Sequence, residues 1–93
     1  MLFVQARTLT KIWVSPEDPG YRFPDQISDI EYVVREVKNV SQLSYTKQLR
    51  DYVAIAQREG YTFELIVRKD TKLSIPLQNA INRGEIILRR ELL

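Results

Sequence analysis

The spacing of apolar residues changes twice in the middle of the chain, and this change limits the possible folds more than any other feature. Residues 22–40 have the apolar, β-branched background of strands. In residues 45–56 apolar side chains recur every three or four positions, which predicts a helix, and residues 61–67 alternate again as a strand does. A strand, a helix and a second strand in this order favour a parallel strand pair joined by a right-handed crossover.

Two helices are expected, at about residues 44–59 and 75–83. Each pattern follows a candidate N-cap serine and stops before a glycine, the residue that most readily ends a helix. The residues expected to mark the helix ends are Ser44 and Gly60, and Ser74 and Gly84. The predicted fold class is therefore α/β (α+β), with a mixed central sheet, a β-hairpin within residues 22–40 and these two helices.

The first part of the chain reads as a separate strand region. Residues 2–14 hold β-forming residues, and the segment Ser15–Gly20, which contains two prolines, is expected to break them. A length of 93 residues suits one domain with a thin core. We expect a single domain over residues 1–93, in which residues 1–20 are an N-terminal strand region and residues 21–93 are the core that carries any active site.

The composition excludes some classes of protein. The chain has no His and no Cys, so an ordinary zinc site is not available. No apolar run approaches the roughly 20 residues that a membrane span requires. Residues 1–40 carry five basic and six acidic side chains, whereas residues 41–93 carry nine basic and six acidic ones. The excess of cations downstream suits surfaces that attract phosphate, although solvated charges on helices and strands explain most of them equally well.

Two acids and a lysine stand out in the hairpin region. Side chains at positions i and i+2 of a strand share one face, so Glu36 and Lys38 are expected to project together. The place of Asp25 depends on the turn. A tight turn at Ser28 and Asp29 would pair Asp25 with Tyr32 and separate it from Glu36.

A looser loop over residues 29–32 gives a different register. It pairs Ile27 with Val34 and places Asp25 opposite Glu36, where cross-strand side chains lie roughly 5 Å apart. Register generally follows the matching of apolar pairs, so we favour this loop.

Two carboxylates at that distance repel each other unless a cation lies between them. Oxygen ligands suit Mg²⁺ or Mn²⁺, with Asp25, Glu36 and the carbonyl of Val37 as the candidate ligands. Lys38 would orient the attacking water or help to deprotonate it, and would offset charge on the phosphate. These residues predict a metal-dependent nuclease. The competing interpretation is that Glu36 and Lys38 form an exposed ion pair of little energetic value.

The predicted helix adds candidate residues to this site. Gln48 and Tyr52 stand one turn apart, so both are expected to reach the end of the sheet where Glu36 and Lys38 lie. Gln48 would hold a substrate phosphate or a water on the metal, although a glutamine on a helix surface is an equally good description. The candidate contacts to nucleic acid are Lys47, Arg50, Tyr52 and Arg22.

Five short fragments, in this order along the chain, carry a resemblance to a known family. They are Arg22–Asp25, Glu36–Val40, Thr46–Asp51, Gly60–Leu65, and Leu73–Ser74 with Gly84–Leu88. Over residues 21–90 the chain resembles the restriction-endonuclease-fold (PD-(D/E)xK) nuclease toxins, which are C-terminal modules of bacterial polymorphic and contact-dependent inhibition toxins.

The resemblance implies roles for four residues. Asp25 and Glu36 would be metal ligands, Lys38 the catalytic lysine and Gln48 an accessory glutamine. It further implies a Mg²⁺-dependent endonuclease that acts on DNA more readily than on RNA and is neutralised by a cognate immunity protein. Such a toxin would act in the bacterial cytoplasm, after secretion or delivery as part of a larger protein.

One departure from the family pattern supports an alternative. Nucleases of this kind commonly have a helix before the first catalytic strand, whereas the residues before Pro24 read as strands here. A second copy of the chain, in a homodimer, would be one replacement for that support. The alternative function is a non-catalytic module that binds nucleic acid or protein and retains the restriction-endonuclease fold.

Overall fold

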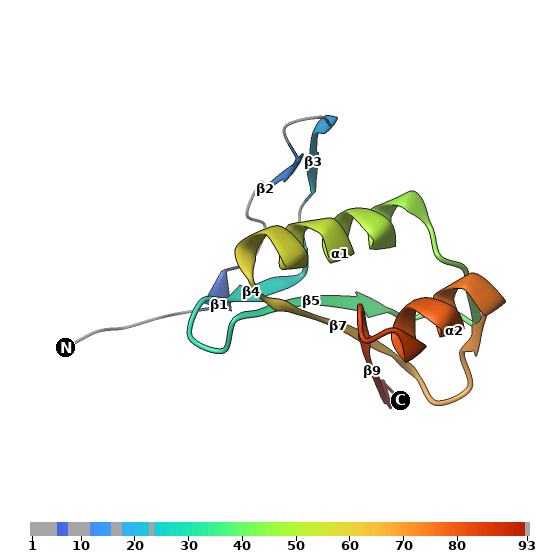
Figure 1. Cartoon of the computed structure of the whole chain (residues 1–93). Helices are drawn as coiled ribbons and strands as arrows, with labels where there is room; N and C mark the ends of the chain where they lie inside the picture. The colour runs from blue at the N-terminus through green and yellow to red at the C-terminus, as the bar shows by residue number, and fades with distance from the viewer. Residues whose placement is uncertain (1–5, 8–11, 16–17, 23, 93) are drawn as a thin grey trace.

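The main sheet has five strands in the order β1-β4-β5-β7-β9. The computed structural model shown in Figure 1 describes residues 6–7, 12–15, 18–22 and 24–92. The strands of this sheet are β1 (Ala6–Arg7), β4 (Gln26–Ser28), β5 (Val33–Lys38), β7 (Thr62–Arg68) and β9 (Ile87–Leu92). Strand β4 is antiparallel to β1 and β5, whereas β7 is parallel to β5 and β9. The predicted mixed central sheet is confirmed.

Two helices connect the parallel strands. Helix α1 (Lys47–Glu59) joins β5 to β7, and helix α2 (Ile75–Asn82) lies between β7 and β9 in the chain. The predicted parallel pair of strands around a helix is thus confirmed. Neither helix is long and apolar enough to cross a membrane, and the described residues form no other α-helix.

Two further strand pairs lie outside the main sheet. β2 (Ile12–Ser15) is antiparallel to β3 (Asp18–Arg22), and β6 (Gln42–Leu43) is parallel to β8 (Lys72–Leu73). The predicted break over residues 15–20 is therefore too long, because β3 already begins at Asp18 and includes a proline and a glycine. A strand with a single partner accepts a proline, since its other edge needs no donor.

Helix α1 begins two residues later than predicted, so Ser44 is not its N-cap. Thr46 is the N-cap, and its hydroxyl accepts a hydrogen bond of 3.2 Å from the Leu49 N–H. The chain before it stays extended because the Leu43 carbonyl accepts from the Ser74 N–H at 3.0 Å, which ties it to the segment after β8. That long-range contact delays the helix.

The other predicted helix limits agree with the structure. Gly60 ends α1 with a φ of 72°, the left-handed conformation that glycine adopts without a Cβ clash. Ser74 is the N-cap of α2, and its hydroxyl accepts from the Leu77 N–H at 3.4 Å. Gly84 follows α2 with a φ of 83°.

The hydrophobic core lies between α1 and one face of the sheet. β7 contributes Phe63, Leu65 and Val67 to it, and β5 contributes Val34. The core side chains from the two helices are Leu49, Tyr52, Val53, Ile55, Ala56, Leu77 and Ala80. Because β5 side chains alternate, the polar residues that follow Val34 at two-residue intervals lie on the same face, at the border of the core.

Candidate active site

The β4–β5 hairpin has the looser of the two turns weighed from the sequence. Ile27 pairs with Val34, and residues 29–32 form the loop between the strands. Both paired side chains are fully buried, so apolar matching explains the register. Tyr32 closes the loop with a φ of 58°, which turns the chain into β5.

This register brings Asp25 beside Glu36. The pair Gln26 and Arg35 is the last one of the β4–β5 ladder, so Asp25 lies just beyond it. The Asp25 N–H donates a hydrogen bond of 3.1 Å to Oε1 of Glu36. The preceding Pro24 is fully buried, which anchors the chain on the core immediately before the acid.

The Asp25 carboxylate is held at the edge of β5. Its Oδ2 accepts a hydrogen bond of 2.8 Å from the Val37 N–H. The N–H and C=O of one strand residue point to the same edge, so the Val37 carbonyl faces the same side as this carboxylate. The hairpin therefore brings the Asp25 carboxylate to the backbone of Val37, whose carbonyl is the third oxygen donor predicted from the sequence.

Glu36 is a buried carboxylate with only 5% of its surface exposed. Oε2 lies 3.3 Å from Nζ of Lys38, which shares its face of β5. Burial, and after it the nearby charge of Asp25, raises the pKa of Glu36, while the Asp25 N–H and Lys38 act in the opposite direction. The site thus pairs a buried carboxylate, Glu36, with the exposed carboxylate of Asp25, and a bound cation would stabilise both charges.

The donor set fits a small divalent cation. No group of three acidic, His or Cys side chains able to hold a metal occurs in the described part of the chain. Two carboxylates and a carbonyl would leave the rest of the coordination shell to water and substrate, which is the pattern that Mg²⁺ prefers. Asp25, Glu36 and the Val37 carbonyl are the groups that would hold it.

Helix α1 meets the same end of β5 through Gln48. Its Oε1 accepts a hydrogen bond of 2.6 Å from Nζ of Lys38. Lys38 therefore lies between the Glu36 carboxylate and the Gln48 amide, with its ammonium fixed on two sides. The expectation that Gln48 reaches this end of the sheet is confirmed.

Tyr52 lies one turn further along α1, and its side chain is 0% exposed. From this position it offers nucleic acid no contact, because α1 packs it into the core against Phe63. Burial, followed by the charges of Glu36 and Asp25, raises the pKa of Tyr52. Its hydroxyl lies close enough to interact with the Glu36 carboxylate, yet no hydrogen bond of standard geometry to a described residue satisfies it.

Arg22 and Lys47 meet on Asp51, a residue to which the sequence gave no role. Arg22 Nε donates to Asp51 Oδ2 at 2.8 Å, and Lys47 Nζ lies 3.1 Å from the same oxygen. Asp51 is buried, and its carboxylate binds both cations. The signal that could have identified it is the spacing of four between Lys47 and Asp51 on a helix.

Arg50 is not part of this arrangement. It follows Gln48 by two residues, which is a rotation of about 200° around the helix. Its guanidinium donates to the Tyr45 carbonyl at 2.9 Å on the exposed side of α1.

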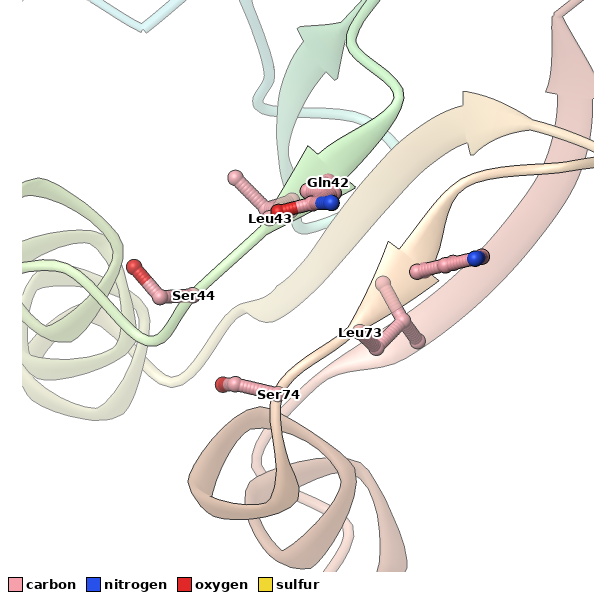
Figure 2. A pocket seen from close by; sticks show the side chains of 6 residues that line it. Gln42, Leu43, Ser44, Leu73 and Ser74 are labelled. Atoms are coloured by element: carbon pink, nitrogen blue, oxygen red, sulfur yellow. The ribbon is translucent and has the colours of Figure 1, made fainter.

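An open pocket lies beyond the carboxyl ends of β5 and β7. It has a volume of about 400 Å³, and Figure 2 shows that β6, β8 and the start of α2 surround it. The Thr71 hydroxyl donates to the Val40 carbonyl at 2.8 Å and so fixes the segment after β7 against the segment after β5. The residues that line the pocket are Gln42, Leu43, Ser44, Lys72, Leu73 and Ser74.

One comparison with known proteins identifies a family. The family model described as restriction endonuclease fold toxin 7 matches residues 3–77. This span contains both strands of the hairpin and all of α1, and therefore every candidate residue discussed above from Arg22 to Tyr52. Neither a curated protein nor a solved structure matches the chain.

Proposed function

The chain belongs to the restriction endonuclease fold toxin family, and from this premise we propose that it is a metal-dependent endonuclease whose chemistry takes place at Asp25, Glu36 and Lys38. Membership of the family indicates a nuclease toxin with nucleic acid as its substrate. The observation that carries the finer proposal is the hydrogen bond from the Asp25 N–H to Glu36, which joins two acids next to a lysine.

Each residue of the chain has a distinct role in this proposal. Asp25 and Glu36, with the Val37 carbonyl, bind Mg²⁺ or Mn²⁺. When bound, the cation supplies Lewis-acid polarisation of the phosphate and a lower pKa for a coordinated water. Lys38, as an ammonium, orients the attacking water and offsets charge that develops on the phosphate; to help deprotonate that water it would first have to give up its own proton. Gln48 keeps the Lys38 ammonium in place through the 2.6 Å hydrogen bond.

The proposed substrate is nucleic acid, and we favour DNA over RNA because the family resemblance implies it. Lys47 and Arg22 are held next to the site by Asp51, which supports a role in contacting backbone phosphates. Arg50 would contact the same strand further away, because it lies on the exposed side of α1. The pocket beyond the end of β5 offers a path for the flanking nucleotides, with Lys72 as its cation.

The proposal also covers how the domain is delivered, where it acts and what it binds. We propose that residues 1–93 act as one domain, delivered as part of a larger toxin of the contact-dependent inhibition type and active in the bacterial cytoplasm. A cognate immunity protein would neutralise it, and a homodimer is the proposed assembly. A non-catalytic binding module remains the second candidate function, favoured by the strands β1, β2 and β3, which precede Pro24 where related nucleases commonly have a helix.

A plasmid-nicking assay with Mg²⁺ separates the two functions. The wild type is expected to nick DNA, and Asp25→Ala and Lys38→Ala are expected to lose this activity. Arg58→Ala, which removes an exposed cation at the other end of α1, is the matched control and should nick as the wild type does. Equal activity in the wild type and both site variants would reject the assigned residues, and no activity in any of them would favour the binding module.

A further inference from the structure

One buried polar atom near the proposed site has no hydrogen-bond partner. Among the residues that the structure describes, the Tyr52 hydroxyl is the buried side-chain oxygen or nitrogen left without one. The ring already packs against Phe63, with ring centroids 5.6 Å apart, so a phenylalanine would fill the same space. Buried polar groups are nearly always satisfied, and an exception calls for a specific reason. Packing explains the ring of Tyr52 but not its oxygen.

The geometry of α1 and β5 explains where this oxygen points. Side chains one turn apart on a helix are separated by about 6 Å along its axis, and alternate side chains of a strand by about 6–7 Å. These two spacings match, so Gln48 and Tyr52 can face Lys38 and Glu36 respectively. The Lys38–Gln48 hydrogen bond fixes this alignment at one end. The neighbouring pair is then Tyr52 and Glu36.

The charges around Tyr52 support this pairing. The carboxylates of Glu36 and Asp25 lie close enough to act on the phenol, Glu36 also as a hydrogen-bond acceptor, while Arg22 acts in the opposite direction. A tyrosine phenol carries its proton at neutral pH, so the Tyr52 hydroxyl is available as a donor. Glu36 can accept a hydrogen bond from this hydroxyl, because a carboxylate offers about four lone-pair positions. The Asp25 N–H and the Lys38 ammonium are the donors that face it in the structure.

We propose that Tyr52 is a positioning residue of the active site. Its hydroxyl donates a hydrogen bond to the Glu36 carboxylate when that carboxylate turns to bind a divalent cation, and so fixes the direction in which Glu36 presents its oxygen. Lys38 is then released from its ion pair with Glu36 and remains held by Gln48. This role rests on the proposed function, because it assumes that Glu36 is a ligand.

The test compares Tyr52→Phe with a matched control, Tyr61→Phe. Tyr61 donates a hydrogen bond of 2.6 Å to Asp29 beside the hairpin loop, at the other end of the sheet, so the control also loses one tyrosine hydroxyl. Mn²⁺ affinity is measured by isothermal titration calorimetry without nucleic acid, and thermal unfolding reports whether each variant is folded. Cleavage kinetics at saturating Mn²⁺ then give kcat and KM separately.

Tyr52→Phe is expected to stay folded, to bind Mn²⁺ about 10-fold more weakly and to have a lower kcat with little change in the KM for DNA, because loss of a group that orients a ligand typically costs 10–100-fold. Tyr61→Phe should keep the Mn²⁺ affinity and kcat of the wild type. Equal Mn²⁺ affinity in the wild type and both variants overturns the role of Tyr52 and leaves the proposed nuclease intact. A wild type that binds no Mn²⁺ and cleaves no DNA overturns both.

Discussion

Lys38 on β5 donates a 2.6 Å hydrogen bond from Nζ to Oε1 of Gln48 on α1. The same ammonium lies 3.3 Å from Glu36 Oε2, so one lysine joins the hairpin to the first turn of the helix. A free lysine side chain samples many rotamers, and ordering it has an entropic cost. Because the contact with Gln48 orders this side chain before substrate arrives, Lys38 is held in a fixed position beside Glu36.

The first prediction concerns Gln48. Gln48→Ala should lower kcat/KM for DNA cleavage by about 10–100-fold, the range seen when a group that orients a catalytic residue is removed. Lys38 would lose one of its two fixed contacts but keep its charge. Gln57→Ala, an exposed glutamine at the other end of α1, is the control and should cleave normally. An unchanged rate for Gln48→Ala would show that Lys38 needs no help from the helix.

The second prediction concerns Asp51, which binds Arg22 and Lys47. Asp51→Asn should lower the free energy of unfolding by about 1–3 kcal/mol, because the buried carboxylate loses its charge and its charged hydrogen bonds with Arg22 and Lys47 are weakened. Asp70→Asn, an exposed acid paired with Arg68, should change it by less than about 0.5 kcal/mol.

Urea denaturation gives these free energies, and a double-mutant cycle identifies their source. If the ion pair with Arg22 is responsible, the effect of Asp51→Asn should shrink in an Arg22→Met background. Additive effects would mean that Arg22 and Asp51 do not stabilise each other.

The third prediction tests where α1 begins. Thr46→Ala removes the hydroxyl that accepts from the Leu49 N–H and should lower the free energy of unfolding by about 1 kcal/mol. Ser44→Ala, two residues earlier, should change it by less than about 0.5 kcal/mol. Thermal or urea unfolding measures both. The reverse order of effects would restore Ser44 as the N-cap.

The fourth prediction is a pH dependence on the sheet face opposite α1. Burial alone would raise the pKa of Glu64, but hydrogen bonds from Arg89 and Arg35 outweigh it, so its pKa lies below the ordinary value of 4.5. A carboxyl whose pKa is lowered on folding stabilises the protein above its unfolded pKa. This contribution is lost as the pH falls through the folded pKa.

Glu64→Gln should therefore lower the free energy of unfolding by about 1–2 kcal/mol at neutral pH, and the difference from the wild type should shrink in acid. The measurement is urea unfolding at a series of pH values. Glu59→Gln, in an exposed pair with Arg58, should show no such trend. A Glu64→Gln difference that stays constant with pH would exclude the ionised carboxylate as its cause.

The sequence predicted the parts of the fold that depend on local pattern. The β5–α1–β7 unit followed from the change of apolar period, and the hairpin register followed from matching Ile27 with Val34. Asp25, Glu36, Lys38 and Gln48 were expected together and lie together, because strand alternation and the hairpin register fix the first three and the helix spacing fixes the fourth.

The features that the sequence did not predict depend on contacts between distant segments. The start of α1 at Thr46 follows from the bond between Leu43 and Ser74, which no local pattern reveals. Tyr52 and Gln48 lie on one stripe of α1, but only the rotation of the packed helix decides that Tyr52 is buried and that Gln48 reaches Lys38. The Arg22–Asp51 pair joins residues far apart in the chain, and the span of β3 needed its partner β2.

The central claim is that Asp25 and Glu36 hold one divalent cation beside Lys38. Anomalous diffraction from crystals soaked in Mn²⁺ with nucleic acid bound tests it most directly. An anomalous peak is expected between the two carboxylates, close to the Val37 carbonyl. Diffraction that shows bound nucleic acid but no anomalous peak between those acids would contradict it.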